Sequence, residues 1–277
     1  MPPTGIAAGV FAALSFGVGD FAGGVAARRA GALIVVAGGH FTGLVALLVG
    51  LLVLRPPLPG LGPALVGVAA GVAGAVGLAA LYRGMSVGSM GIVTSLSGAG
   101  SVAIPLVAGA VLGASITPVQ LVGVACTAAA AAAAGGASRD EVGRRALMLA
   151  GAAAIGFGGW YVLLDLAASG GDPLWALVFS RATSATLTGA AAFGRFGRSR
   201  FPIRIVVAAG LCDVAGNVLY VIARDEIPIG VAAALTGLYP IATMILARFV
   251  LGEHLPRLGQ VGVALALLGI VLISAGG

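Results

Sequence analysis

Long apolar segments follow one another along almost the whole chain, separated by short connections that contain arginine, acidic residues, or proline and glycine. A helix of about 20 apolar residues spans the roughly 30 Å hydrocarbon core of a bilayer, which is the length of these segments. Only 9% of the 277 residues are charged, whereas a soluble domain has about 25%, so a water-facing surface is excluded. The ten predicted spans are residues 5–27, 31–54, 61–82, 87–112, 118–136, 146–168, 173–193, 205–223, 229–251 and 257–275. The chain is therefore expected to be a polytopic membrane protein.

The predicted spans are expected to be helices, because transmembrane strands are shorter, about ten residues, and alternate apolar with polar side chains. A polar connection at residues 137–145 divides the chain into 1–136 and 146–277, with five spans in each half. The two halves are similar to each other, since the segment 91–114 aligns with the segment 230–253. An odd number of spans turns the second copy upside down in the membrane. The predicted fold is all-α, with ten transmembrane helices in two inverted five-helix repeats joined by a cytoplasmic linker.

Arginine supplies all 15 basic residues and is concentrated in the odd-numbered connections. These connections contain Arg28, Arg29, Arg83, Arg139, Arg144, Arg145, Arg195, Arg198, Arg200, Arg204 and Arg257, whereas the even-numbered ones contain Arg55 and Arg224. Basic residues favour the cytoplasmic side, so we expect the odd connections in the cytoplasm and both termini outside. Because the arginines lie at segment ends and form no single patch, we expect no nucleic-acid partner. The abundance of alanine, glycine and arginine suggests a GC-rich bacterial gene, and hence the bacterial plasma membrane.

Few ionisable side chains fall inside the predicted spans, and each needs an explanation, because an unpaired charge in hydrocarbon is costly. Asp20, His40 and Asp213 are all expected about 10 to 14 Å from the cytoplasmic face, at 1.5 Å per helical residue. Asn217 follows Asp213 by one helical turn and shares its face. One hypothesis is that the two acids bind a cationic substrate group or a proton, with His40 as partner or relay. The alternative is that these side chains only cross-link helices through buried hydrogen bonds.

Asp165 and Arg181 belong to consecutive predicted spans and lie close to the connection that those spans share. A long arginine side chain can bridge such a separation, so a structural ion pair between them is expected. Alternatively, Arg181 binds a substrate carboxylate, because its planar guanidinium suits one.

Aromatic residues and prolines occur near the middle of several predicted spans. Trp160, Tyr161 and Tyr239 are candidate stacking surfaces for a flat or cationic substrate, with ordinary helix packing as the alternative. Pro105 and Pro240 each remove a helix hydrogen bond, so kinks that let a gate flex are expected there. The sequence contains no metal-ligand cluster and no phosphate-binding loop, so neither a metal, a cofactor nor ATP hydrolysis is expected.

The run LYPIATMILARFVLGEHLPRLGQVGVALALLGIVLIS, residues 238–274, resembles the end of an EamA repeat of the drug/metabolite transporter superfamily. Its proline, its Leu-Gly-Glu turn and its Gln/Gly-rich final helix carry the resemblance. SFGVGDFAGGVAARRAG, residues 15–31, and LYRGMSVGSMGIV, residues 81–93, extend it to the first half. The glutamate of the turn is present at Glu253 but replaced by Ala114 in the first half, so any capping or gating by this acid operates at one end only.

The resemblance implies a secondary transporter that works by alternating access around a midplane cavity formed mainly by helices 1, 3, 4, 6, 8 and 9. It implies export of a small polar metabolite, such as an amino acid, as the function. Efflux of cationic drugs is the first alternative, and a membrane scaffold without transport is the second. A membrane enzyme is disfavoured, because the sequence contains no nucleophile with a base and no metal cluster. The expected partners are the substrate and the lipid bilayer, with protons as coupling ion and a homodimer left open.

Overall fold

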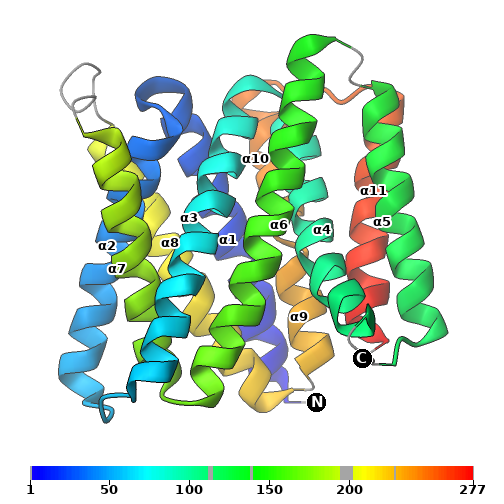
Figure 1. The fold of residues 1–277 in the computed structure, drawn as a ribbon. Coiled ribbons are helices and arrows are strands. Elements are labelled where there is room, and N and C mark those ends of the chain that lie inside the picture. Colours follow the sequence, from blue (N-terminus) through cyan, green and yellow to red (C-terminus); the bar gives the residue numbers. More distant parts are fainter. Residues whose placement is uncertain (1, 112–114, 138–139, 194–201, 228, 277) are drawn as a thin grey trace.

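The structure, a computed structural model, describes residues 2–111, 115–137, 140–193, 202–227 and 229–276, and its regular elements are α-helices. They are α1 (Pro3–Ala30), α2 (Ala32–Leu54), α3 (Leu61–Val87), α4 (Met90–Val111), α5 (Pro118–Ala137), α6 (Glu141–Ser169), α7 (Pro173–Ala192), α8 (Ile203–Glu226), α9 (Ile229–Gly237), α10 (Tyr239–Leu251) and α11 (Arg257–Ala275). The helices stand side by side with their axes roughly along one direction (Figure 1). The predicted all-α fold is confirmed for the described residues.

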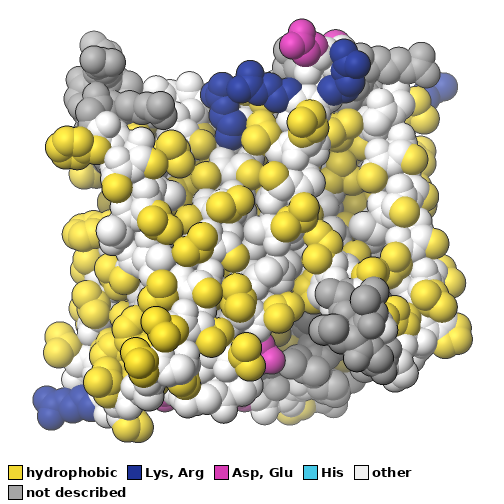
Figure 2. Space-filling model, in the orientation of Figure 1, with side chains coloured by type: hydrophobic (Ala, Val, Ile, Leu, Met, Phe, Trp, Pro, Cys, Tyr) yellow, Lys and Arg dark blue, Asp and Glu magenta, His cyan; other side chains and the backbone are white. Residues whose placement is uncertain are grey.

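Eight of the described helices, namely α1 to α6, α8 and α11, are long and apolar enough to cross a membrane. Large apolar side chains are exposed on the flanks of these helices, for example Phe11 (58% exposed), Leu52 (73%) and Ile155 (66%). Figure 2 shows such side chains over the flank of the bundle. Exposed apolar area on this scale is unfavourable in water and suits contact with lipid. The chain is a multi-pass membrane protein.

Arginine side chains gather at one end of the bundle, where α1 and α3 end and α6 begins (Figures 1 and 2). Arg28 and Arg29 occupy the last turn of α1 at this end. Helix α1 begins and α11 ends at the opposite end (Figure 1). This is the arrangement that the arginine distribution predicts. Five residues of the sequence-based predictions lie outside the described residues, namely Ala114 of the first repeat and the arginines Arg139, Arg195, Arg198 and Arg200.

The predicted span at residues 229–251 is two helices, α9 and α10, interrupted at Leu238. Pro240 lies in the first turn of α10, where its missing N–H is tolerated. A proline deeper in a helix removes a hydrogen bond and clashes with the carbonyl four residues before it, so the helix ends ahead of Tyr239 and restarts. The kink expected at Pro240 is therefore an interruption. Pro105 lies inside α4, which continues past it.

Helix α6 begins at Glu141, inside the range predicted as the linker. Asp140 is the N-cap of this helix, and its carboxylate accepts a hydrogen bond of 3.1 Å from the Gly143 backbone N–H. Such a cap satisfies one of the N–H groups that a helix start leaves unpaired.

The core of the bundle is formed by helices of the first half packed against helices of the second. The extensive contacts join α3 to α6, α1 to α8, α5 to α11 and α2 to α7. Small residues allow the backbones to approach closely at these crossings. A Cβ added at Gly156 of α6 would lie 2.5 Å from the Gly77 backbone of α3, closer than atoms can pack. Glycines at the crossings thus allow close contact between helices that are far apart in sequence.

Candidate functional site

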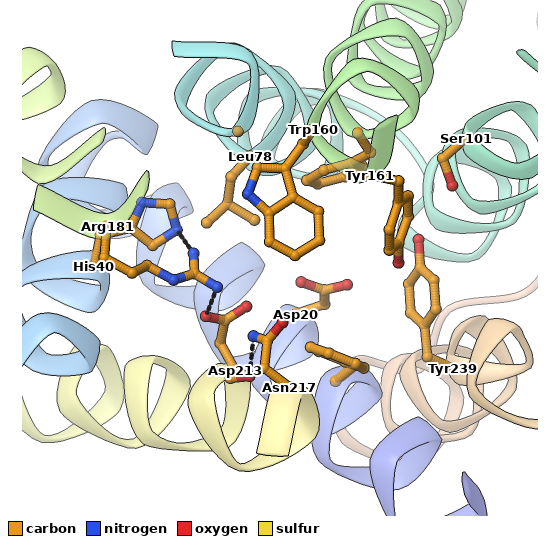
Figure 3. A pocket seen from close by; sticks show the side chains of 13 residues that line it. Asp20, His40, Leu78, Ser101, Trp160, Tyr161, Arg181, Asp213, Asn217 and Tyr239 are labelled. Carbon is orange, nitrogen blue, oxygen red and sulfur yellow. Dashed lines mark hydrogen bonds and ion pairs between the residues drawn. The ribbon is translucent and has the colours of Figure 1, made fainter. Parts of the chain in front are cut away.

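A cavity of about 70 Å³ lies in the interior of the bundle, between helices of both halves. Its lining contains all eight residues that the sequence nominated for substrate or proton binding. These are Asp20 of α1, His40 of α2, Trp160 and Tyr161 of α6, Arg181 of α7, Asp213 and Asn217 of α8, and Tyr239 of α10. Figure 3 shows their side chains converging on one space. The structure therefore assembles the predicted set, and the role of each residue stays a prediction.

Arg181 and Asp213 form an ion pair in this cavity, with Arg181 Nη2 2.5 Å from Asp213 Oδ2 (Figure 3). The Arg181 side chain is 6% exposed and the Asp213 side chain 23% exposed, so the pair is largely removed from solvent. The expected ion pair between Arg181 and Asp165 is wrong. Asp165 is exposed near the end of α6, and its backbone carbonyl accepts a hydrogen bond from the Ser169 hydroxyl. Sequence proximity favoured Asp165, but the packing of α2 against both α7 and α8 brings Arg181 to α8.

His40 links this ion pair to Ser184 through its two ring nitrogens. Arg181 Nη1 lies 2.5 Å from His40 Nε2, and His40 Nδ1 lies 2.5 Å from Ser184 Oγ. A guanidinium can only donate, so Nε2 accepts and the imidazole is neutral, with its proton on Nδ1. Nδ1 then donates to the Ser184 hydroxyl. This geometry suits a hydrogen-bonding partner better than a proton relay, because a proton on Nε2 would break the contact between His40 and Arg181.

Two further hydrogen bonds position the polar side chains of the cavity wall. Asn217 Nδ2 donates to the Asp213 backbone carbonyl at 2.8 Å, which fixes the amide one turn along α8. Trp160 Nε1 donates to Ser180 Oγ at 3.0 Å and so joins α6 to α7. The Trp160 and Tyr161 rings meet edge to face, with centroids 5.1 Å apart. The aromatic wall is thereby held in place by a hydrogen bond and by ring packing.

Asp20 is the acidic side chain of the cavity that this network leaves out. No described residue donates a hydrogen bond to its carboxylate or forms a salt bridge with it at 4.0 Å or less. Figure 3 shows the carboxylate pointing into the space between Trp160, Asp213 and Tyr239. Because Arg181 already compensates Asp213 and His40 is neutral, the charge of Asp20 has no counter-charge among the side chains that line the cavity.

The remaining lining residues are Phe16, Gly74, Leu78, Ser101 and Phe157, and the sequence analysis missed them. The sequence contains a signal for two of these residues. Phe16 lies one helical turn before Asp20, and Phe157 one turn before Tyr161, so each phenylalanine shares a helix face with a nominated residue. The Ser101 hydroxyl donates to the Gly98 carbonyl of its own helix, as membrane-helix serines often do. Nothing in the sequence separates such a serine from one that faces a cavity.

Glu253 caps the start of α4 from the other half of the chain. Its carboxylate accepts backbone N–H bonds from Met90 (3.1 Å) and Gly91 (3.2 Å) and also contacts the Ser89 hydroxyl. A carboxylate at a helix N-terminus satisfies unpaired N–H groups and opposes the positive end of the helix dipole. This contact ties α4 to the turn after α10 at the arginine-rich end.

Among the described residues, no group of three His, Cys, Asp or Glu side chains is placed to hold a metal ion. The chemistry that the cavity offers is charge compensation, hydrogen bonding and aromatic contact.

Comparison with known proteins adds to this geometry. Residues 144–275 match the profile of the EamA-like transporter family. The second half of this chain is thus similar to the EamA-like transporter family. This family is part of the drug/metabolite transporter superfamily, whose members are membrane transporters and are generally not enzymes. The resemblance stated from the EamA motifs is confirmed.

A solved structure is similar in fold to nearly the whole chain, whereas no curated protein matches it. Seven chains of known structure match. One of them, described as a crystal structure of a protein, has a TM-score of 0.63 and 17% sequence identity, and the match covers 98% of this chain and 96% of that one. At this identity the likeness concerns the fold alone. The fold of that structure thus extends over both halves of the bundle.

Proposed function

We propose that this EamA-like protein is a secondary transporter that exports a small polar metabolite carrying a positively charged amino group, such as an amino acid. The observation that carries the proposal is the uncompensated carboxylate of Asp20 inside a cavity walled by aromatic rings. The cavity lies between the two halves, where alternating access of a bundle needs its binding site. The bacterial plasma membrane is the proposed location.

The charge balance of the cavity favours a substrate group or coupling ion with one positive charge. Asp213 and Arg181 cancel each other, so Asp20 leaves the lining with one excess negative charge when it is ionised. An isolated carboxylate in low dielectric is costly, so a bound ammonium group or a proton would relieve that cost. The faces of Trp160, Tyr161 and Tyr239 add attraction for an ammonium group.

The size of the cavity favours a small metabolite over a drug. Pockets for drug-sized ligands have volumes of about 300 to 1,000 Å³, whereas this cavity has about 70 Å³. Efflux of a large cationic drug is the alternative function, and it requires the cavity to open several-fold. Helix movement during transport would enlarge the cavity for either substrate, but a small metabolite requires less enlargement than a drug.

The helix contacts support ten spans in two inverted repeats, 1–136 and 146–277, joined by the linker 137–145. If α1 to α5 correspond in order to α6, α7, α8, α9 with α10, and α11, then the contact of α1 with α8 corresponds to that of α6 with α3. The contacts of α2 with α7 and of α5 with α11 correspond to themselves. Such matching pairs of helix contacts are expected of two halves related by a pseudo-two-fold axis in the membrane plane.

Gating in this proposal uses the elements that the sequence nominated. Glu253 closes the arginine-rich end by capping α4, while the break before Pro240 divides α9 from α10 at the level of the cavity. Pro105 in α4 supplies a second position without a helix hydrogen bond. Rocking of α4 and α10 about these points would expose the cavity to alternate sides.

The test compares the small molecules in the medium of cells that produce the wild type, Asp20→Asn or Asp165→Asn at equal membrane levels. Asp165→Asn is the matched control, because it also removes an acid from a membrane helix but lies outside the cavity. The expected result is a compound that accumulates with wild type and Asp165→Asn but not with Asp20→Asn.

Vesicles loaded with that compound then test proton coupling. If Asp20 carries the coupling proton, Asp20→Asn should exchange substrate across the membrane but not respond to a proton gradient; if Asp20 binds the substrate ammonium group, exchange should be lost as well. Equal transport by the wild type and Asp20→Asn would contradict the proposed role of Asp20. A scaffold function would be favoured if no variant changed the transport of any compound in either direction.

A further inference from the structure

A second cleft, of about 380 Å³, opens at the arginine-rich end of the bundle, beside the C-terminal half of α10. Its walls come from α10, the start of α4, the turn after α10 and the start of α11. The residues that carry the argument are Ile245, Arg248, Phe249, Glu253, His254 and Gln260. The cleft shares no lining residue with the cavity around Asp20.

Arg248 gives this cleft a positive charge that the protein does not compensate. Its side chain is exposed, and no described carboxylate forms a salt bridge with it. The acid in the wall, Glu253, has both oxygens engaged by the start of α4, through Ser89, Met90 and Gly91. Glu253 is thus committed to the helix dipole of α4, and the guanidinium of Arg248 keeps all its donors for a ligand.

His254 and Gln260 add polar groups on the same rim. His254 Nδ1 lies 2.6 Å from the Gly252 carbonyl, which can only accept, so Nδ1 carries the proton and donates. The opposite ring nitrogen, Nε2, has no partner among the described residues. Gln260 donates through Nε2 to the Leu255 carbonyl at 3.0 Å. The rim therefore offers a guanidinium as a donor and an imidazole nitrogen as an acceptor.

Below this rim the wall of the cleft is apolar and open to the bilayer. Phe249 is 84% exposed and Ile245 is 51% exposed, and Ile245 lies one helical turn deeper in the membrane than Phe249. Arg248 lies three residues before the end of α10 at Leu251, which places it about 5 Å below the helix end at 1.5 Å per residue. Because basic residues at the ends of spans lie near the membrane surface, we expect Arg248 at the level of the lipid headgroups.

We propose that this cleft binds an anionic phospholipid, with Arg248 donating to the headgroup phosphate and an acyl chain lying along Ile245 and Phe249. A basic side chain at the headgroup level, above an exposed apolar wall, matches both parts of a lipid. A free phosphate would use only the rim and leave the apolar wall uncovered. Because Glu253 in the same cleft caps α4, an occupied cleft would also hold the turn after α10 against α4.

The test measures lipid binding by the purified full-length protein, so its outcome does not depend on transport. Native mass spectrometry counts the dioleoylphosphatidylglycerol retained in competition with dioleoylphosphatidylcholine, for wild type, Arg248→Gln and Arg29→Gln. Arg29 is the matched control, because it is exposed at the same end of the bundle but outside the cleft. We expect wild type and Arg29→Gln to prefer phosphatidylglycerol, and Arg248→Gln to bind it about fivefold more weakly.

Thermal melting in nanodiscs is the second measurement. Phosphatidylglycerol is expected to raise the melting temperature of wild type and Arg29→Gln more than that of Arg248→Gln, with equal melting in phosphatidylcholine as evidence of folding. The absence of any preference for phosphatidylglycerol in the wild type would overturn the proposal, even if Arg248→Gln failed to fold. So would an equal preference in Arg248→Gln. Equal stabilisation of the wild type by inorganic phosphate would indicate a site for a free anion instead.

Discussion

Arg181 and Asp213 form an ion pair of 2.5 Å that joins α7 to α8 across the interior of the bundle. The same guanidinium bonds His40, which bonds Ser184, so four side chains from three helices form one chain of contacts. These side chains do two things at once. They hold α2, α7 and α8 together, and they neutralise one of the two cavity acids, which leaves Asp20 as the charge that a substrate would meet.

Breaking this ion pair from one side is expected to destabilise the protein more than removing both partners. Arg181→Gln leaves Asp213 without its counter-charge, and Asp213→Asn does the same to Arg181, at a cost of about 3 to 5 kcal/mol each. The double variant leaves no buried charge uncompensated, so its melting temperature in detergent should exceed that of either single variant. Transport should be lost in the double variant as well as in both single variants. If its melting temperature were lower than that of both single variants, the ion pair would not be the main interaction of these residues.

The structure predicts that His40 acts by positioning Arg181. His40→Leu removes the acceptor of one guanidinium donor, and a buried donor without a partner costs about 1 to 3 kcal/mol. His40→Gln keeps a side-chain acceptor, so it should melt closer to the wild type and keep its response to a proton gradient. The measurements are thermal melting in detergent and gradient-driven uptake in vesicles. A stable His40→Gln protein without a gradient response would favour a proton relay.

Removing the carboxylate of Glu253 should loosen the start of α4. Glu253→Ala leaves the Met90 and Gly91 N–H groups without their acceptor, and losing such a cap costs about 0.5 to 2 kcal/mol. Hydrogen exchange followed by mass spectrometry should therefore show faster exchange at residues 90 and 91, and thermal melting a modest loss. Glu141→Gln is the control, because Glu141 lies in the first turn of α6, at the same end of the bundle. Unchanged exchange in Glu253→Ala would show that the cap does not restrain α4.

Two glycines of α6 should respond differently to the same substitution. Gly156→Ala places a Cβ 2.5 Å from the Gly77 backbone, so α3 and α6 must separate and the protein should melt at a lower temperature. Gly151→Ala meets nothing within 4 Å, so it should be neutral or stabilising by up to about 1 kcal/mol through helix propensity. Equal melting of the two variants in detergent would show that α3 and α6 can separate without loss.

The positions of the described helices along the chain are close to those that the sequence predicted, except next to Pro240. Apolar length is a property of the chain itself, because the bilayer requires about 20 apolar residues from each span. The interruption between α9 and α10 differs from the predicted kink. A proline indicates that a helix hydrogen bond is lost, but whether the helix bends or restarts depends on the neighbouring helices that take up the freed groups.

The sequence predicted eight residues of the cavity lining, but not how their side chains pair. Asp20, His40 and Asp213 could be nominated from sequence, because polar groups in an apolar span require a reason and helical rise fixes their depth. The partner of Arg181 could not, since proximity along the chain pointed to Asp165 of the neighbouring span. Only helix packing, with α2 in contact with both α7 and α8, decided for Asp213. The depth of a residue in the membrane follows from its position along its own helix. Which side chains pair depends on how the helices rotate and approach one another, and that arises from contacts between distant parts of the sequence.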